Sequence, residues 1–561
     1  MIERLRSGCA LLLLGLLAVC SSAATKPNLV LVTLDSTRAD RMGFLGAKAG
    51  LTLNLDRLAS ESIVFEHAYA QAPGTVASHA TILSGAYPQT TGMSEIGGTL
   101  PSSLPYLPDL LKAQGYRTAA FVSSVQLDPR NGPAQGFDRG FQTYQPNDGG
   151  TAALGRPAER SSATVARATT WLTRNAPAPF FLWIHLAVPR PNGASYNAAI
   201  TAEDAAIGKL LTVLRQQKLD ATTAIVVVAA HGQSLGAHGE ETHGIFLYDE
   251  TIHVPLLARL PAGLAAAKKV SAKVRLVDIA PTLLEIAGVS VPSQMQGQSL
   301  LRIARAASVP DQPVYSRADL PQRGFGWSPL ESWRAGKYLY IRAPKPELYD
   351  LTADPAATRN LAQTSKATLD TMAAQLESFD RRFTGEAAKS STTELSSSEM
   401  QKLASLGYVG LQKSASVAVA VTGTDPKDKI AVANKVIEAA ENAAQGKLDQ
   451  TIAQLEPINA ADPNFYLAQY TLGTALAQAG KYAEAIKHLH KAIELQPDAA
   501  WAHYAIGTAL LKTGDYKTAA IHLEIAAGRL PEFARAHRAL AEAYEHMGRT
   551  AEAKKEQGKA N

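Results

Sequence analysis

The sequence predicts an α/β domain, with a mostly parallel sheet covered by helices, followed by an all-α repeat domain. Two observations carry this prediction. Short runs of branched apolar residues alternate with helical patterns in the first part of the chain, which is typical of a parallel sheet covered on both faces. In the last part, small residues and prolines recur every 34 residues. With 561 residues, the chain is also too long for a single core.

The composition is that of a globular protein without a nucleic-acid partner. Hydrophobic residues make up 46% of the chain and charged residues 19%, which separates it from disordered sequences. The net charge of +5 is small for this length, and the basic residues form no run. We therefore expect no binding of nucleic acid.

Residues 1–24 have the pattern of an export signal. Two arginines precede an apolar run at 10–19, and small residues at 22–24 offer a cleavage site. The run is too short to span a membrane comfortably, so we expect no transmembrane span in the mature chain and a periplasmic or secreted protein. Cys20 leaves lipoprotein anchoring as a minor alternative, because Val19 before it is bulkier than the small residue such signals usually carry.

Both cysteines of the chain, Cys9 and Cys20, lie within this signal. Cleavage after residue 24 leaves a mature protein without any thiol. That excludes disulfides, cysteine nucleophiles and thiolate metal ligands together.

Four apolar runs within residues 25–410 have the length and branched side chains of buried strands, and they lie at 29–34, 118–122, 180–186 and 223–229. Asp35 and His231 come just after two of these runs, and His185 lies near the end of a third. Ligands gather at the carboxyl ends of the strands in such sheets. We therefore expect these three side chains to converge at one edge of the sheet.

The stretch Gln71–Gly92 places a hydroxyl at the predicted start of a helix. Pro73 and Gly74 break the backbone, Thr75 follows, and residues 77–83 continue as a helix. Free N–H groups and the helix dipole at such a start favour an anion. Thr75 is thus a candidate nucleophile facing a phosphate or sulfate. The alternative is that Thr75 only caps the helix.

Four motifs together resemble the sulfatase branch of the alkaline phosphatase superfamily. They are L-V-T-L-D-S-T-R-A-D-R-M-G-F-L-G from Leu31, the Thr75 stretch, H-G-Q-S-L-G-A-H-G-E-E-T-H-G from His231, and D-I-A-P-T-L-L-E-I-A-G from Asp278. P-E-L-Y-D-L-T-A-D-P from Pro346 resembles the closing segment of the family. The resemblance covers about residues 27–410 and implies the sulfatase-like, alkaline-phosphatase-like α/β fold.

The resemblance implies a nucleophile, bound to one or two divalent metals, that attacks a phosphate or sulfate ester and forms a covalent intermediate. True sulfatases use a formylglycine made from Cys or Ser in a motif like C-x-P-S-R, whereas this chain reads T-V-A-S-H from Thr75. We therefore expect no formylglycine. The chain is more similar to the threonine-nucleophile members, so an anionic phosphate ester is favoured over a sulfate ester.

Family positions carried over residue by residue imply the following site: Thr75 as the catalytic nucleophile; Asp35, Thr75, His231 and His243 as metal ligands; and His79, His185 and Arg190 as binding residues for the anionic ester. Each position also has a simpler interpretation. An aspartate at a strand end is commonly a turn residue, and a histidine in a glycine-rich loop, such as His243, is commonly solvated.

Three positions depart from the family pattern. Ala230 stands where the family has Asp before His-Gly, and Val188 and Arg190 stand where it has Asp and His in H-x-x-D-P-H. At most one divalent metal is then expected. Zinc, which accepts few donors of mixed type, is favoured over calcium or magnesium, which need several oxygens. Arg190 can hold an anion but cannot activate a threonine.

Small residues mixed with Lys and Pro mark a linker at 411–431. Residues 432–561 follow, and the 34-residue interval there matches tetratricopeptide repeats. About four units are expected, starting near 432, 466, 500 and 534. Such repeats bind a protein or peptide partner, self-associate or brace a neighbouring domain.

Two hypotheses of function follow from the sequence. The first is an exported, metal-dependent hydrolase or transferase that acts on a phosphate or sulfate ester through Thr75, with repeats that recruit a partner. The second is a catalytically lapsed relative that serves as an anion-binding or protein-interaction scaffold. Asp35, Thr75 and His231 favour the first, while Ala230 and Arg190 favour the second.

Overall fold

The structure is a computed structural model that describes residues 26–146, 157–175, 179–187, 193–261, 267–306, 310, 312–387, 396–406, 408 and 421–560. The predicted signal at 1–24, with Cys20, lies outside the described residues. So do Val188, Arg190 and the first part of the predicted linker. Among the described residues, none of the helices has the length and hydropathy of a membrane span.

An eight-stranded sheet forms the centre of the first domain, in the order β10-β2-β9-β8-β1-β7-β4-β6. All its pairs are parallel except those that β9 makes with β2 and β8. Its strands are β1 (Asn28–Asp35), β2 (Ile63–Tyr69), β4 (Arg117–Val122), β6 (Thr143–Gln145), β7 (Phe180–Ala187), β8 (Thr223–Ala229), β9 (His253–Arg259) and β10 (Lys268–Arg275). The predicted mostly parallel sheet is confirmed.

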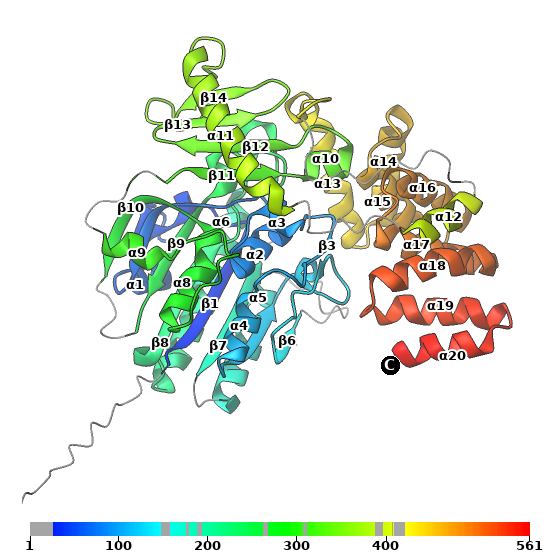
Figure 1. The fold of residues 1–561 in the computed structure, drawn as a ribbon, viewed down its shortest axis with the longest axis horizontal. Coiled ribbons are helices and arrows are strands. Elements are labelled where there is room, and N and C mark those ends of the chain that lie inside the picture. Colours follow the sequence, from blue (N-terminus) through cyan, green and yellow to red (C-terminus); the bar gives the residue numbers. More distant parts are fainter. Residues whose placement is uncertain are drawn as a thin grey trace, which may run out of the picture.

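Strands β1 and β8 lie side by side in the middle of this sheet and are buried along their whole length. Their nearly continuous apolar sequence is what a strand covered on both faces requires. The covering helices are α1 (Leu53–Ala59), α2 (Thr75–Ser84), α4 (Leu107–Ala113), α5 (Pro157–Asn175), α6 (Gly193–Gln216), α8 (Ile279–Ile286) and α9 (Leu300–Arg305). Figure 1 shows α2, α4 and α8 in front of the strands.

A second, antiparallel sheet follows, which the sequence analysis did not predict. It consists of β11 (Val314–Ala318), β12 (Leu330–Ala335), β13 (Tyr338–Arg342) and β14 (Glu347–Asp350). Helix α11 (Lys366–Ala387) packs on it, and Phe379 stacks on Tyr315 with ring centroids 4.7 Å apart. The remaining short helices are α3 (Pro88–Thr91), α7 (Asp249–Ile252) and α10 (Leu320–Phe325), and β3 (Gly98–Thr99) pairs with β5 (Ala134–Gln135) in a separate two-stranded sheet.

The C-terminal part is a row of paired helices, coloured from yellow through orange to red in Figure 1, and the predicted all-helical domain is confirmed. Its helices are α13 (Ile430–Ala444), α14 (Leu448–Ala461), α15 (Tyr466–Gln478), α16 (Tyr482–Leu495), α17 (Ala500–Thr513), α18 (Tyr516–Arg529), α19 (Ala534–His546) and α20 (Thr550–Lys559). Glycine is required where two helices meet: a Cβ on Gly473 would lie 2.7 Å from Leu489 Cγ, and one on Gly507 2.6 Å from Leu523 Cγ.

A polar side-chain pair joins the two helices in three of these units, always at the same repeat positions. We call them the inter-helix pairs. In each unit, the first member also hydrogen-bonds the carbonyl of a proline in the preceding loop. The pairs are Gln469–His488 at 2.8 Å with Pro463, His503–His522 at 2.9 Å with Pro497, and His537–Glu556 at 2.6 Å with Pro531. Each buried polar group thereby gains a partner.

A segment between the two domains packs against the repeats. Helix α12 (Ser397–Ser405) forms an ion pair from Lys402 to Glu524 on α18. After it, Tyr408 stacks on His490 with ring centroids 4.1 Å apart, and its hydroxyl lies 3.4 Å from Nε2 of His522. The chain therefore contacts the middle repeats before it enters the first one.

The repeats also contact the first domain directly. Asn434 on α13 donates its Nδ2 hydrogen to the carbonyl of Gly239 at 2.8 Å. Phe465 packs edge-on against Trp327, with ring centroids 5.6 Å apart. The side chain of Gln496 donates to the carbonyl of Arg323. These contacts hold the repeat row against the edge of the α/β domain (Figure 1).

Candidate active site

The three polar residues expected at the strand ends meet at one edge of the sheet. Asp35 ends β1, and the residue beside it on β7 is Ala187, two positions after His185. On the other side, Leu34 pairs with Ala229 at the end of β8, so that His231 follows within two residues. Parallel pairing in register therefore brings together residues that are far apart in sequence.

Asp35, Thr75 and His231 form a hydrogen-bonded triangle. The Thr75 hydroxyl donates to Oδ2 of Asp35 at 2.8 Å and lies 3.3 Å from Nε2 of His231. Nε2 of His231 lies 2.7 Å from Oδ1 of Asp35. All three side chains are buried. Nδ1 of His231 hydrogen-bonds the carbonyl of Gly232 at 2.8 Å, which fixes the ring.

Charge inside the triangle is balanced by an ion pair. Burial disfavours the carboxylate of Asp35, but His231 and His185 outweigh it and hold the pKa of Asp35 well below its usual range. Burial likewise disfavours a charged imidazole, yet Asp35 raises the pKa of His231. Both shifts favour a carboxylate on Asp35 and an imidazolium on His231.

Thr75 is the first residue of α2, not its cap. The N-cap is Gly74, and the Thr75 hydroxyl is directed to Asp35 instead of to the backbone of its own helix. The capping interpretation of Thr75 is therefore wrong. The helix also runs from Thr75 to Ser84, longer than the 77–83 predicted.

Glu95, which the sequence analysis missed, occupies the N-terminus of α2. Its Oε1 accepts the N–H groups of Val76 at 3.0 Å and Ala77 at 3.3 Å. A Cβ on Gly74 would lie 2.5 Å from Oε1, so only glycine at this N-cap admits the carboxylate. Burial raises the pKa of Glu95, and the charge on His231 opposes that shift. A negative group thus already lies where an anionic ester is expected.

The remaining predicted site residues differ in what they contact. His79 uses both ring nitrogens internally, Nδ1 with the carbonyl of Thr75 at 2.7 Å and Nε2 with the hydroxyl of Thr33 at 2.9 Å. Burial lowers the pKa of His79 to about 3, so its ring is neutral. The structure thus gives His79 a role in positioning the helix that carries Thr75, whereas the sequence analysis expected it to bind substrate.

His185 and His243 lie on two sides of the triangle. Nε2 of His185 is buried 3.6 Å from Oδ2 of Asp35 and has no hydrogen-bond partner among the described residues. His243 packs its ring 4.2 Å from that of His231, and its Nδ1 bonds the side chain of Gln233 at 2.7 Å. Arg190 lies outside the described residues. The structure therefore places His185 beside the carboxylate of Asp35, and His243 against the ring of His231.

The edges of the triangle are hydrogen-bonding distances. They measure 2.7, 2.8 and 3.3 Å, and two of them are shorter than the about 3.3 Å that separates zinc ligands at about 2.0 Å in a tetrahedron. Among the described residues, no group of three or more His, Cys, Asp or Glu side chains is placed to hold a metal ion. One carboxylate, one hydroxyl and one imidazole are donor types that suit zinc better than calcium, but they could hold it only after His231 gives up its proton and the triangle opens.

Comparison with known proteins identifies the domains. Residues 27–289 match the family described as sulfatase, and residues 242–382 match the C-terminal region of N-sulphoglucosamine sulphohydrolase. Residues 27–289 are similar to this family and are called the sulfatase domain after the match. Residues 473–514 and 504–557 match tetratricopeptide repeat families, so repeats follow the sulfatase domain.

Several relatives of the sulfatase domain are sulfatases. An ulvan-active sulfatase from Formosa agariphila is 28% identical over 402 residues, which cover 60% of this chain and 77% of the relative. A Delta 4,5-hexuronate-2-O-sulfatase from Bacteroides thetaiotaomicron is 22% identical over 427 residues, which cover 62% of this chain and 88% of the relative.

Solved structures support the same fold. The phosphonate monoester hydrolase of Agrobacterium radiobacter superposes with a TM-score of 0.55 at 17% identity, over 64% of this chain and 96% of that one. A 2-O GAG sulfatase superposes with a TM-score of 0.54 at 21% identity, over 64% of this chain and 92% of that one. These superpositions confirm the expected sulfatase-like α/β fold.

Ala230 is the departure that bears most directly on the sulfatase domain. The residue is fully buried beside His231, and its N–H donates to the carbonyl of Leu34 at 2.7 Å. The backbone is thus in place, but a methyl group stands where the family pattern has a carboxylate. Any cation in the triangle then faces a single negative charge, from Asp35.

Proposed function

We propose that the sulfatase domain binds a sulfate or phosphate ester of a saccharide at the N-terminus of α2 and transfers its sulfuryl or phosphoryl group to Thr75. The observation that carries this proposal is the position of the Thr75 hydroxyl, at the first residue of α2 and 2.8 Å from the carboxylate of Asp35. Sulfate and sugar are proposed because the relatives are an ulvan-active sulfatase and a hexuronate sulfatase.

The residues of the triangle divide the reaction between them. Oδ2 of Asp35 accepts the proton of the Thr75 hydroxyl as Oγ1 forms a bond to sulfur or phosphorus. The bond from sulfur or phosphorus to the ester oxygen breaks, and this oxygen leaves with the electron pair as an alkoxide, which takes a proton from water to give the alcohol. The hydroxide left behind attacks the sulfur or phosphorus of the ester on Thr75. Oγ1 of Thr75 then leaves and takes back the proton from Oδ2 of Asp35, and sulfate or phosphate is released. A divalent ion held by Asp35, Thr75 and His231 would supply positive charge to the hydroxyl and the anion.

The rate of ester hydrolysis should be low, because the site has too few negatively charged ligands for a cation. Loss of an outer partner of a metal ligand typically costs about 10–100-fold in affinity or activity, and Ala230 removes a ligand itself. A second candidate function is a lapsed sulfatase that serves as a scaffold. One observation favours it: Glu95 already fills the N–H groups on which an ester would be bound.

The two candidate functions are separated by measuring the hydrolysis of an aryl sulfate and an aryl phosphate. The proteins compared are the natural protein, Thr75→Ala and Ala230→Asp. We expect weak hydrolysis that Thr75→Ala abolishes, and a metal content in Ala230→Asp at least about 10-fold higher than in the natural protein. Equal rates for the natural protein and Thr75→Ala would leave the scaffold as the function. The two substrates decide between sulfate and phosphate chemistry.

The location and the partner complete the proposal. We propose that the protein is exported after loss of residues 1–24, because a charged start, a short apolar run and a small-residue end form one signal there and no cysteine follows it. N-terminal sequencing of the exported protein should find a start near Thr25, and Met1 there would contradict export by cleavage. The repeats, which match tetratricopeptide families, are proposed to bind a protein partner.

A further inference from the structure

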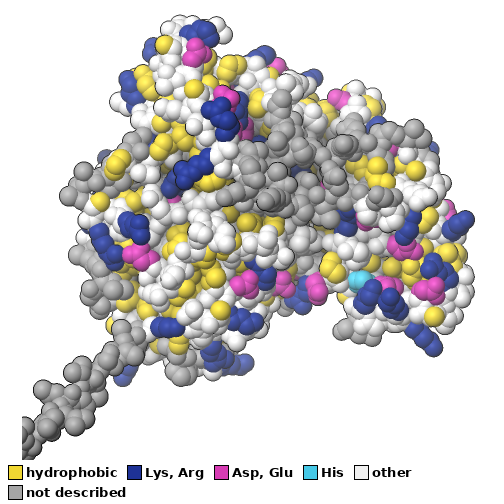
Figure 2. Space-filling model, viewed as in Figure 1, with side chains coloured by type: hydrophobic (Ala, Val, Ile, Leu, Met, Phe, Trp, Pro, Cys, Tyr) yellow, Lys and Arg dark blue, Asp and Glu magenta, His cyan; other side chains and the backbone are white. Residues whose placement is uncertain are grey.

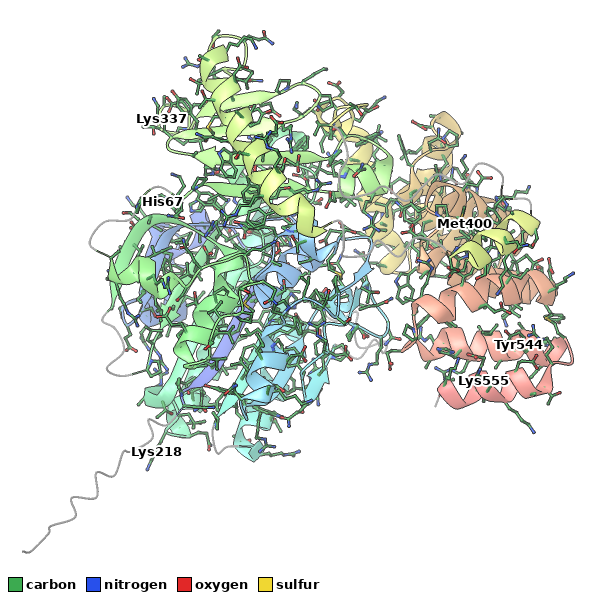
Figure 3. The ribbon with its side chains drawn as sticks, in the orientation of Figure 1. His67, Lys218, Lys337, Met400, Tyr544 and Lys555 are labelled. Carbon is green, nitrogen blue, oxygen red and sulfur yellow. The ribbon has the colours of Figure 1, made fainter. Side chains whose placement is uncertain are left out.

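A recess of about 770 Å³ opens between the two sheets, away from Thr75. The strands β10 and β2 of the large sheet form one wall, and the turn between β12 and β13 forms the other. We call it the lysine recess. Its basic side chains are Lys268, Lys269, Lys273, Arg334, Lys337, His67 and His253. Figure 3 labels His67 on the large sheet and Lys337 on the small one, on the same side of the molecule.

Positive charge exceeds negative charge in the lysine recess. Asp249 is the one carboxylate among the described residues that line it. From outside the lining, Glu66 lies 3.5 Å from Lys269, and Asp350 lies 2.7 Å from Lys337. Five lysine and arginine side chains thus line the recess, against one carboxylate in its described lining. Burial, together with His253 and Lys273, lowers the pKa of His67, as expected in a positive environment.

One cation of the lysine recess is fixed in place by its neighbours. The side chain of Arg334 is 2% exposed, forms an ion pair with Asp249 and lies over the ring of Tyr69 at 4.4 Å. Its Nε has no hydrogen-bond partner among the described residues. A buried N–H without a partner is costly unless a ligand or water accepts it. Arg334 therefore adds a fixed, buried positive charge to the wall of the recess.

The recess is connected to the catalytic edge of the sheet by α7. Asp249 lines the recess, and the next two residues, Glu250 and Thr251, accept the N–H groups of Gln233 and Gly232 at 2.8 and 2.7 Å. Gly232 directly follows His231. Helix α7 therefore joins the wall of the recess to the loop that carries His231.

We propose that the lysine recess binds a sulfated oligosaccharide. Its cations are spread over two sheets and its volume is that of a ligand with several groups, too large for a single sulfate ion. An anionic chain with charges at intervals matches this arrangement better than one ion does. The carbohydrate class rests on the proposed function, but binding in the recess does not depend on turnover at Thr75.

Titration of a fluorescent heparin hexasaccharide into the full-length protein at physiological salt tests the proposal. Lys268→Gln together with Lys269→Gln removes two exposed charges from the recess. We expect this variant to bind at least about 10-fold more weakly, with a further loss when Lys337→Gln is added from the other wall. The matched control is Lys554→Gln with Lys555→Gln, an adjacent exposed pair on α20 (Lys555 is labelled in Figure 3).

The outcomes separate this proposal from the proposed function. Unchanged binding in Thr75→Ala, with loss in the recess variant, supports the recess whether or not the protein turns over an ester. Equal loss in the α20 control would show that binding is general electrostatic attraction and would overturn the proposal. The proposal would also be overturned if a six-nucleotide oligothymidylate bound in the recess as tightly as the heparin hexasaccharide, because the recess would then not select a sulfated saccharide over a nucleic acid.

Discussion

Replacing Glu95 tests whether the anion position at α2 is blocked by the protein itself. In the folded chain its carboxylate accepts two backbone N–H groups, at 3.0 and 3.3 Å. A buried hydrogen bond to a charged group contributes about 1.5–3 kcal/mol. Glu95 is only partly buried and its second bond is long, so we take about 1–2 kcal/mol for the pair. An external anion must displace this internal one before it binds.

Glu95→Ala should therefore bind inorganic sulfate or phosphate about 5–30-fold more tightly than the natural protein, the factor that corresponds to that free energy. Its free energy of unfolding should fall by a similar amount, because two N–H groups of α2 lose their acceptor. Isothermal titration calorimetry and urea unfolding measure the two quantities. Glu95→Gln keeps a hydrogen-bond acceptor but not the charge. Its anion affinity and its free energy of unfolding should therefore lie between those of the natural protein and those of Glu95→Ala. Unchanged anion affinity in Glu95→Ala would refute the argument that Glu95 competes for this position.

Two further predictions concern the repeats. Burial lowers the pKa of His503 to about 4 and that of His522 well below its usual range. Since the unfolded state takes up these protons first, stability should fall as the pH drops below about 6.5, by about 2 kcal/mol at pH 5 for His503 alone. Urea unfolding at pH 7.5 and 5 measures this, and His503→Gln should weaken the pH dependence. Gly507→Ala should destabilise by about 1–3 kcal/mol, because its Cβ meets Leu523. Gly528→Ala, with open space at its Cβ, should be neutral or stabilising in thermal unfolding, and equal losses would contradict the packing argument.

The sheet could be predicted because its strands carry strong local signals. The branched apolar runs before Asp35 and His231 are buried in parallel pairs, and Gly473 and Gly507 recur because helices touch there. The second sheet had weaker signals. Strand β12 reads L-E-S-W-R-A, and its polar side chains are buried through partners on other elements, such as Arg334 with Asp249.

The residues of the candidate active site also fall into those that the sequence predicts and those that it does not. Asp35 and His231 could be anticipated because each follows a strand whose position in a parallel sheet is fixed. Glu95 could not, because its contact with α2 depends on a loop that returns to Gly74, and no local pattern records that return. His79 was assigned to substrate from its place in a motif, whereas both of its ring nitrogens are used within the fold.

The inter-helix pair of His503 and His522 fixes a single tautomer on each ring. The carbonyl of Pro497 can only accept, so Nε2 of His503 carries the hydrogen and its Nδ1 accepts from Nδ1 of His522. That leaves Nε2 of His522 to accept from the hydroxyl of Tyr408. The hydrogen bonds therefore all donate in one direction. They run from Tyr408, in the segment between the domains, through His522 and His503 to the carbonyl of Pro497 in a loop of the repeats. Removing the Tyr408 hydroxyl should change the nitrogen chemical shifts of both rings, so that two imidazoles inside the repeats report whether the segment that joins the domains is in place.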